Sequence, residues 1–324
     1  MVKYTLMIAS GVLLGFILIW PHMMQQKNFV NKMLAEATRN VPDKASINMQ
    51  QVFFKAEDEK HQPYTITADS IIETDVNNNV MTLDNPTSTM KLNSGMTLFA
   101  QAPAASLWQS KKILQMINPV TIRSDDGHRA TIKELTIDAK ERSAFSPNPF
   151  TLTGPRLFVS ADRFSLQDNG DNIFLYGKVK IRFQDTKKDK KFILMAEEKV
   201  HIEQPTNTIT ALQNARLNDG TNILAADKLI IHMTKMGKQQ YELEELEAYG
   251  HVVVKTPDEI IKGDEAFYTQ DTATVTGNAE IQRKGGRLTG SKISIDMKSG
   301  LSKIISDSMQ RVKGRLSPTM FKGN

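Results

Sequence analysis

The chain has 324 residues, of which 40% are hydrophobic and 24% charged, with a formal net charge of +5 and no cysteine. The length accommodates two domains of ordinary size or one elongated repeat structure. The lack of cysteine excludes a disulfide framework, a cysteine-ligated zinc site and a thiol nucleophile. The mild positive charge suits a phosphate-rich partner, but it is also common on ordinary solvated surfaces.

Residues 1–22 predict a transmembrane anchor. No charged residue occurs from Tyr4 to Trp20, and at about 1.5 Å per residue this run is just long enough to span the hydrocarbon of a bilayer. Lys3 favours an orientation with the N-terminus inside. A cleaved signal peptide is the competing interpretation, but the small residues of a cleavage site are absent just beyond the apolar run. We therefore expect an uncleaved anchor.

Residues 23–45 predict a stalk helix or linker. Met24, Phe29 and Met33 share a loose apolar stripe at helical spacing, and Pro42 ends the pattern. We expect this segment to continue the membrane helix or to lie at the bilayer surface.

From residue 46 onward, apolar and polar residues alternate. In the stretch from residue 177 to 183, Val179, Ile181 and Phe183 fall on one face and three cations fall on the other. Such alternation is typical of strands with one buried face. Turn signals such as Asp219-Gly220 separate the alternating runs. The sequence therefore predicts an all-β body.

A short unit recurs along this body: an apolar residue, any residue, Ala or Gly, and then Asp or Glu. Its copies are Ile66-Thr67-Ala68-Asp69, Val159-Ser160-Ala161-Asp162, Leu194-Met195-Ala196-Glu197, Leu224-Ala225-Ala226-Asp227 and Ile261-Lys262-Gly263-Asp264. Each unit amounts to about two strands and cannot bury its own apolar face, so stacked units share one continuous interior. We expect the small residue to mark a strand that is crowded or turns a corner, and the acid to be a solvated turn residue.

The charged loop from Asp185 to Lys191 is the best internal boundary, as a domain linker or as the tip of a long hairpin. We expect β domains over residues 46–185 and 186–307, followed by a disordered basic tail over 308–324. Whether the two β domains form one continuous structure or two articulated ones stays open.

The sequence contains no recognisable catalytic or cofactor motif. Its six histidines are far apart, and no nucleophile elbow, phosphate-binding loop or dinucleotide fingerprint occurs. Carboxylates fall mainly in turns and on outward faces. We expect no enzymatic activity, no metal and no cofactor, and the interleaving of acidic and basic residues argues against a nucleic-acid partner.

The continuous apolar face has two interpretations, namely a filled core or a groove for flexible acyl chains. The elongated repeat, the 16 adaptable methionines and the predicted membrane anchor favour the groove. The candidate lipid-binding residues are the inward members of the alternating strands: Ile66, Leu135, Ile137, Val179, Ile181, Phe183, Val200, Ile202, Leu229, Ile231, Val252, Val254, Val275, Ile293 and Ile295.

Several of these segments resemble a known family. The N-terminal apolar segment and the strands Tyr64-Thr65-Ile66-Thr67-Ala68-Asp69 and Leu175-Tyr176-Gly177-Lys178-Val179 resemble LptC, the anchored component of the lipopolysaccharide exporter. Residues from about 192 to 305 are similar to its soluble partner LptA, an OstA-like protein, through motifs such as Leu246-Glu247-Ala248-Tyr249-Gly250 and Val275-Thr276-Gly277-Asn278. LptC and LptA are usually separate chains, so whether a separate LptA is still needed stays open.

The resemblance implies an elongated open β-jellyroll whose apolar groove shields lipid A acyl chains. It implies an inner-membrane, single-pass protein with its bulk in the periplasm, which performs no chemistry. The implied partners are lipopolysaccharide, an inner-membrane ABC transporter complex like that of LptB, LptF and LptG, and an LptA- or LptD-like jellyroll joined by edge-strand pairing. The alternative is a structural or scaffolding β-repeat envelope protein with a filled core and no lipid cargo.

Overall fold

The computed structural model describes residues 48–316 except for 58–62, 76–78, 92–94, 139, 186–189, 236–240, 270–271, 285, 297–298, 300–301 and 307–311. The described residues form β-strands and one short 3-10 helix, Asp168–Gly170. Within them, no helix has the length and apolar character needed to cross a membrane. The expected anchor (1–22) and stalk (23–45) lie outside this part of the chain. The prediction of an all-β body is confirmed.

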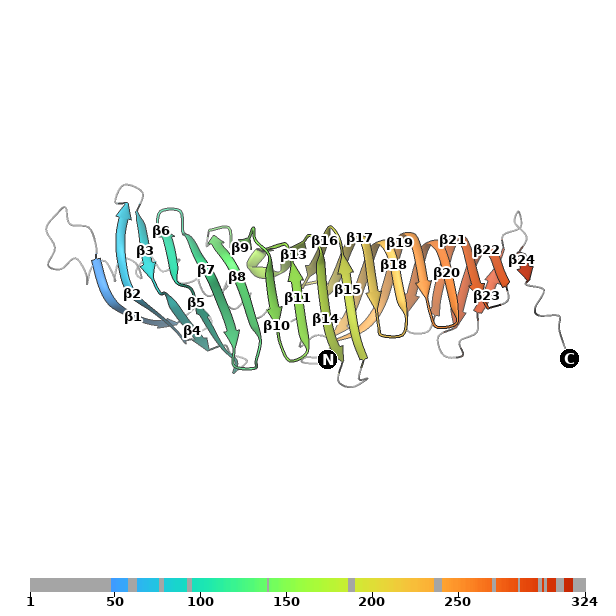
Figure 1. The fold of residues 1–324 in the computed structure, drawn as a ribbon, viewed down its shortest axis with the longest axis horizontal. Coiled ribbons are helices and arrows are strands. Elements are labelled where there is room, and N and C mark those ends of the chain that lie inside the picture. Colours follow the sequence, from blue (N-terminus) through green and yellow to red (C-terminus); the bar gives the residue numbers. More distant parts are fainter. Residues whose placement is uncertain are drawn as a thin grey trace. The chain divides into compact units, whose positions relative to one another are not determined.

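The strands, which Figure 1 shows in chain order by colour, form two compact units, divided between Leu175 and Tyr176. We call them the N-terminal unit and the C-terminal unit. The first contains β1 (Asn48–Glu57), β2 (Pro63–Asp75), β3 (Val80–Asp84), β4 (Thr87–Lys91), β5 (Thr97–Gln101), β6 (Ala104–Trp108), β7 (Ile113–Ser124), β8 (Arg129–Asp138), β9 (Ser143–Ser146), β10 (Phe150–Thr153), β11 (Leu157–Ala161), β12 (Arg163–Gln167) and β13 (Asn172–Tyr176). Its strands pair antiparallel, and β2 lies beside β1, β3 and β4.

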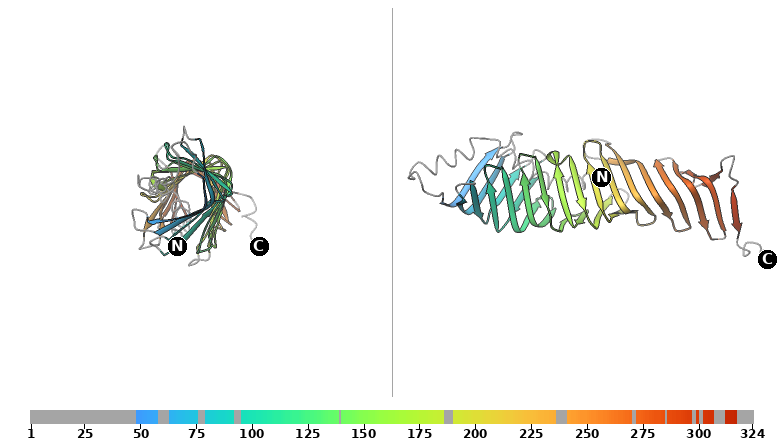
Figure 2. Two further views of the ribbon diagram at one scale, coloured as in Figure 1. Left: turned by 90° about the vertical axis from the view of Figure 1, so that its left-hand side faces the viewer. Right: turned by 90° about the horizontal axis from the view of Figure 1, so that it is seen from above.

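The C-terminal unit is an antiparallel meander of mostly longer strands. It contains β14 (Val179–Asp185), β15 (Lys190–Ala196), β16 (Lys199–Glu203), β17 (Thr208–Asn218), β18 (Ile223–Lys235), β19 (Tyr241–Lys255), β20 (Glu259–Thr269), β21 (Thr272–Arg283), β22 (Gly286–Asp296), β23 (Ser302–Ile305) and β24 (Lys313–Leu316). From β17 to β22 each strand pairs with the next (Figure 2). The last strand, β24, pairs with β22 inside the segment where the sequence predicted a disordered tail.

The long strands of the C-terminal unit are bent near their middle. A register shift interrupts each pairing from β17–β18 to β21–β22. The backbone turns left-handed at these points, at Gln213, Asn214, Gly250, His251, Gly277 and Asn278. A bulge of this kind bends a strand. Each long strand therefore consists of two arms that meet at a corner.

Acidic side chains bond to residues with a left-handed backbone conformation on a neighbouring strand or turn. The bonded pairs are Asp69 with Asn85 (2.8 Å), Glu197 with Asn214 (2.8 Å), Asp227 with His251 (2.8 Å) and Asp264 with Asn278 (2.9 Å). These acids are four of the five acids of the repeated sequence unit. They are exposed, as expected, but each has a defined partner that the sequence did not reveal.

The small residue of the repeated unit lies where the strands crowd at the corner. Ala68 and Ala226 are both 5% exposed. A Cβ atom added to Gly263 would lie 2.4 Å from Cγ1 of Val275 and 2.9 Å from the carbonyl oxygen of Thr276. The expectation that this position marks a crowded turn of the strand is confirmed.

Candidate functional site

The inward residues of the C-terminal unit form rows across its strands, because each pairs with an inward residue of the next strand. One row beside the corner contains Val200, Ala211, Leu229, Ala248, Ala266, Val275 and Ile293. Beside the corner on the other arm lie the cross-strand pairs Val179 with Ala196, Ala215 with Ala226, Val252 with Gly263 and Ala279 with Gly290. We call these residues the floor. Those in the first row are at most 7% exposed, and the many alanines and glycines follow from the crowding at the corner.

Farther from the corner, each arm carries another inward row. The first rim contains Leu217, Leu224, Val254, Ile261, Ile281 and Leu288. The second rim contains Ile202, Ile209, Ile231, Leu246, Tyr268, Ala273 and Ile295, whose members pair directly across the strands in the same way.

Several rim side chains are half-buried although they continue the inward row. They are Leu217, Leu224, Val254 and Leu288 on the first rim, and Ile202, Tyr268, Ala273 and Ile295 on the second. The interior of the C-terminal unit therefore passes from a sealed floor to two partly accessible apolar rims.

An aromatic pair extends the first rim on β14 and β15. Phe183 and Phe192 face each other in register, with ring centroids 4.8 Å apart and planes 11° apart. Both rings are half-buried, whereas Ile181 and Leu194, two residues closer to the corner, are 2% and 3% exposed. Accessibility thus increases toward the strand ends.

The inward side chains of β7 and β8 in the N-terminal unit are buried. Leu114, Ile122, Ile132 and Ile137 are each 0% exposed. An enclosed void beside Ile66 and Leu114 measures only about 10 Å³, which is at most about the room that one water molecule needs.

The predicted lipid-binding residues divide into half-buried and buried ones. Phe183, Ile202, Val254 and Ile295 are half-buried. The buried members are Ile66, Leu135, Ile137, Val179, Ile181, Val200, Leu229, Ile231, Val252, Val275 and Ile293, all at most 8% exposed. Contact of these residues with a ligand stays a prediction. The sequence analysis missed Phe192, Leu217 and Leu224 as candidates. Apolar neighbours break the alternation around Phe192 and Leu224, whereas Leu217 lies in an alternating run.

A polar network lies on the outward side of the C-terminal unit. Glu247 accepts a hydrogen bond from the Tyr249 hydroxyl and contacts His232 Nε2 at 2.8 Å. The hydrogen bond from Tyr249 is the main cause that lowers the pKa of Glu247, and the same bond raises the pKa of Tyr249 to about 12. Lys228 lies over the Tyr249 ring, 5.8 Å from its centroid. Both carboxylate oxygens are engaged, so the network holds neighbouring strands together.

Ser124, Asp126 and His128 meet in the turn between β7 and β8. Ser124 and His128 both bind the same oxygen of Asp126, with His128 Nδ1 at 2.9 Å. Burial raises the pKa of Asp126, but the hydrogen bonds from Ser124 and His128 outweigh it and the pKa is lowered. Because the hydroxyl is directed to the carboxylate rather than to the imidazole, the three residues do not form a nucleophile–base pair.

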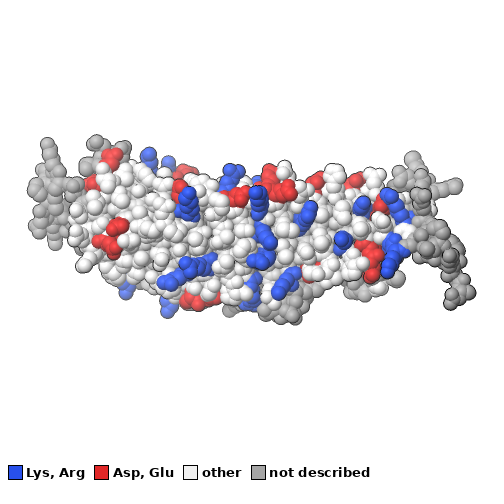
Figure 3. Space-filling model, in the orientation of Figure 1, with Lys and Arg blue, Asp and Glu red and all other residues white. Residues whose placement is uncertain are grey.

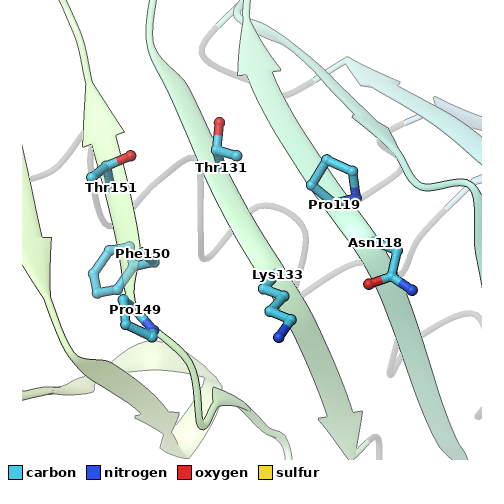
Figure 4. A pocket seen from close by; sticks show the side chains of 7 residues that line it. All are labelled: Asn118, Pro119, Thr131, Lys133, Pro149, Phe150 and Thr151. Atoms are coloured by element: carbon cyan, nitrogen blue, oxygen red, sulfur yellow. The ribbon is translucent and has the colours of Figure 1, made fainter.

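A surface hollow of about 540 Å³ lies on the outer side of the N-terminal unit (Figure 4). It is lined by Asn118, Pro119, Thr131, Lys133, Pro149, Phe150 and Thr151. The hollow forms where a bulge after Ile117 interrupts the pairing of β7 with β8. In the described part of the chain, no group of three or more His, Asp or Glu side chains is placed to hold a metal ion.

These features define an all-β antiparallel protein whose strands enclose an apolar interior. Residues 11–184, more than half of the chain, match the family model described as "Lipopolysaccharide-assembly, LptC-related". The chain belongs to this family. Residues 195–301 match the model "LptA/(LptD N-terminal domain) LPS transport protein". The protein is therefore an LptC with an LptA-like section, as the sequence motifs predicted, and a component of the lipopolysaccharide transport bridge.

One solved structure similar to this chain is LptH from Pseudomonas aeruginosa, described as the LptA homologous periplasmic component of the conserved lipopolysaccharide transport device. The two are 14% identical, the match covers 39% of this chain and 95% of that one, and the TM-score is 0.34. No curated protein matches the chain by sequence. The matching family models describe assembly and transport proteins rather than enzymes.

Proposed function

We propose that this protein shields the acyl chains of lipopolysaccharide in its apolar interior and passes them from an inner-membrane transporter towards the outer membrane. The observation that carries the proposal is the pair of half-buried apolar rims of the C-terminal unit. Each methylene that an acyl chain buries there contributes about 0.8 kcal/mol. A row of several rim residues is therefore sufficient to hold a chain.

In this proposal the C-terminal unit is an open jellyroll in which acyl chains first contact the rims. Val254 and Ile202 are the accessible contacts, one on each rim. Residues of the floor such as Val252, which is 1% exposed, touch lipid only when the two arms separate. The same holds for Ile66, Leu135 and Ile137 in the N-terminal unit.

The proposal includes the expected organisation of the chain. Residues 1–22 anchor the protein in the inner membrane and residues 23–45 form a stalk. The β domains, 46–185 and 186–307, lie in the periplasm. The matches to LptC-related proteins over residues 11–184 and to LptA-like proteins over residues 195–301 support this division.

Partner proteins join the terminal strands by β-augmentation, with no nucleic acid involved. Among the described strands, β1 pairs with β2 alone and so presents a free edge. Phe53 on β1 is 67% exposed, and a long exposed edge with an apolar side chain favours pairing with another chain. We expect an LptB, LptF and LptG-like transporter and an LptA- or LptD-like jellyroll as the partners.

The sealed interior of the N-terminal unit favours a second candidate function. With Leu114, Ile132 and Ile137 at 0% exposure, this unit fits a scaffold with a filled core. On this alternative the protein connects other components and carries no lipid.

Photo-crosslinking in cells distinguishes the two functions. A photoreactive residue at Val254 or Ile202 captures lipopolysaccharide if the rims bind acyl chains. The matched controls are outward positions on the same strands, Val253 and His201. Equal capture at inward and outward positions, or none at all, would contradict the transport function and favour the scaffold.

A further inference from the structure

The two rims of the C-terminal unit differ in charge. On the first rim, an exposed cation adjoins a half-buried inward residue on three strands: Arg182 with Phe183, Lys191 with Phe192, and Lys255 with Val254. Figure 3 shows Lys and Arg side chains over β14 and β15. Alternation directs these cations outward, but Lys and Arg side chains are long enough to bring their charge to the rim.

On the second rim the corresponding neighbours are carboxylates. Glu203 adjoins Ile202 at the end of β16, and Asp296 adjoins Ile295 at the end of β22. Glu245, on β19, adjoins Leu246 of the same row. A negatively charged group at the mouth of the interior would therefore be repelled from this rim.

The first rim also contains carboxylates, two of which are paired with cations. Asp219 accepts hydrogen bonds from the backbone nitrogens of Thr221 and Asn222, at 3.0 and 2.7 Å. Two more carboxylates form ion pairs, Glu259 with Arg283 and Glu280 with Arg287. Asp258 remains exposed in the turn between β19 and β20. The hydrogen bonds to Asp219 come from neutral groups and leave its charge in place, so Asp219 and Asp258 are opposed on this rim by three cations, Arg182, Lys191 and Lys255.

We propose that the first rim is a phosphate-binding strip, in which Lys191 and Lys255, with Arg182, hold the headgroup phosphates of an amphiphile whose acyl chains lie in the interior. The inference rests on the proposed function and adds an orientation to it. The phosphates lie along the first rim, and the acidic second rim disfavours the reverse arrangement. The mixed apolar and cationic strand ends match the two chemical parts of such a ligand.

The test uses the full chain in nanodiscs, with a photoreactive residue at Val254 as the reporter. The probes are bisphosphorylated lipid A and the same lipid with both phosphates removed. The test variant is Lys191→Ala with Lys255→Ala. The matched control is Lys180→Ala with Lys292→Ala, which removes the same charge near the corner.

We expect the rim variant to raise the lipid A concentration at half-maximal capture by about tenfold, since each exposed ion pair contributes about two- to fivefold. The rim variant should capture the dephosphorylated lipid as well as the wild type does. The control variant should capture lipid A as well as the wild type does. The conservative variant Lys191→Arg with Lys255→Arg retains capture. This last result excludes a folding defect caused by substitution at these positions.

Three outcomes would overturn the phosphate-binding strip. These are an equal loss in the control variant, an equal loss with the dephosphorylated lipid, and no loss at all while the wild type still captures lipid A. If inorganic phosphate alone competes as well as lipid A, the rim binds free anions and the headgroup assignment is wrong. If the wild type captures neither lipid, the proposed function itself fails.

Discussion

Asn278 donates a hydrogen bond of 2.9 Å from its side-chain amide to the Asp264 carboxylate, and so connects the corner of β21 to β20. Asn278 has a φ of 48°, a conformation that Asn tolerates better than most residues. The carboxylate of Asp264 also lies against Gly277, where an added Cβ would be 2.4 Å from Oδ2. The acid and the left-handed corner of the next strand therefore form one structural unit, and the relationship recurs at Asp69 and Glu197.

Removal of this acid should loosen the corner. We expect Asp264→Ala to lower the free energy of unfolding of the C-terminal unit by about 1 kcal/mol, the usual contribution of one hydrogen bond. Hydrogen exchange of peptides from β20 and β21 measures the change. Asp258→Ala, in the neighbouring turn, is the control and should leave exchange unchanged; equal effects of the two variants would contradict a specific role of the corner bond.

A methyl group at Gly263 should be more damaging. The added Cβ would lie 2.4 Å from Val275 Cγ1 and 2.9 Å from the Thr276 carbonyl oxygen. We expect Gly263→Ala to cost about 1–3 kcal/mol in unfolding free energy, as overpacking usually does. The reverse change at the equivalent position, Ala226→Gly, should cost about 0.5–1 kcal/mol. Urea denaturation followed by circular dichroism compares them, and a Gly263→Ala protein as stable as the wild type would refute the crowding.

Floor and rim leucines should respond differently to the same substitution. Leu229 is 0% exposed, whereas Leu224, on the same strand, is half-buried. We expect Leu229→Ala to cost about 2–5 kcal/mol, since it leaves a cavity in a packed region. Leu224→Ala should cost less than half as much but reduce lipopolysaccharide capture by a photoreactive residue at Val254. Similar stability losses, with capture unaffected, would argue that the rim is simply part of the core.

The hydrogen bond between Tyr249 and Glu247 should make the stability of the protein decrease at high pH. Its hydrogen bond to Glu247 raises the pKa of Tyr249 from 10.0 to about 12 in the folded protein. A raised pKa contributes stability below the unfolded value, and this contribution is lost as the pH rises through the folded value. The difference in unfolding free energy between the wild type and Tyr249→Phe should therefore shrink from about pH 10 to about pH 12. Urea denaturation across this range measures it, and a constant difference would contradict the prediction.

The same network should also make the free energy of unfolding depend on acidic pH, with stability lost as the pH falls. The bond from Tyr249 lowers the pKa of Glu247 below the ordinary value of 4.5. The stabilisation is therefore present at neutral pH and is lost as the pH falls below about 4.5. In Glu247→Gln this acid-dependent part should be absent. Unfolding curves of the two proteins at neutral pH and at about pH 3 provide the comparison, and parallel losses of stability would contradict the assignment to Glu247.

The sequence by itself determined the class of fold and the side of each strand that faces inward. The alternation of Val179, Ile181 and Phe183 with cations requires a pleated strand with one apolar face, because successive side chains point to opposite sides. The repeated small residue and acid also indicated a corner. These are local properties, and they were sufficient for the family resemblance that the comparisons confirmed.

Only the tertiary structure decided which inward residues are sealed and which remain accessible. Ile181 and Phe183 belong to the same apolar run, yet one is 2% exposed and the other is half-buried. The difference follows from their distance to the corner. The tertiary structure also showed that Asn278 bonds to Asp264, 14 residues earlier in the chain. It placed Lys255 and Lys191 on one rim. The pairing and register of the strands set these relations, and local alternation carries no information about them.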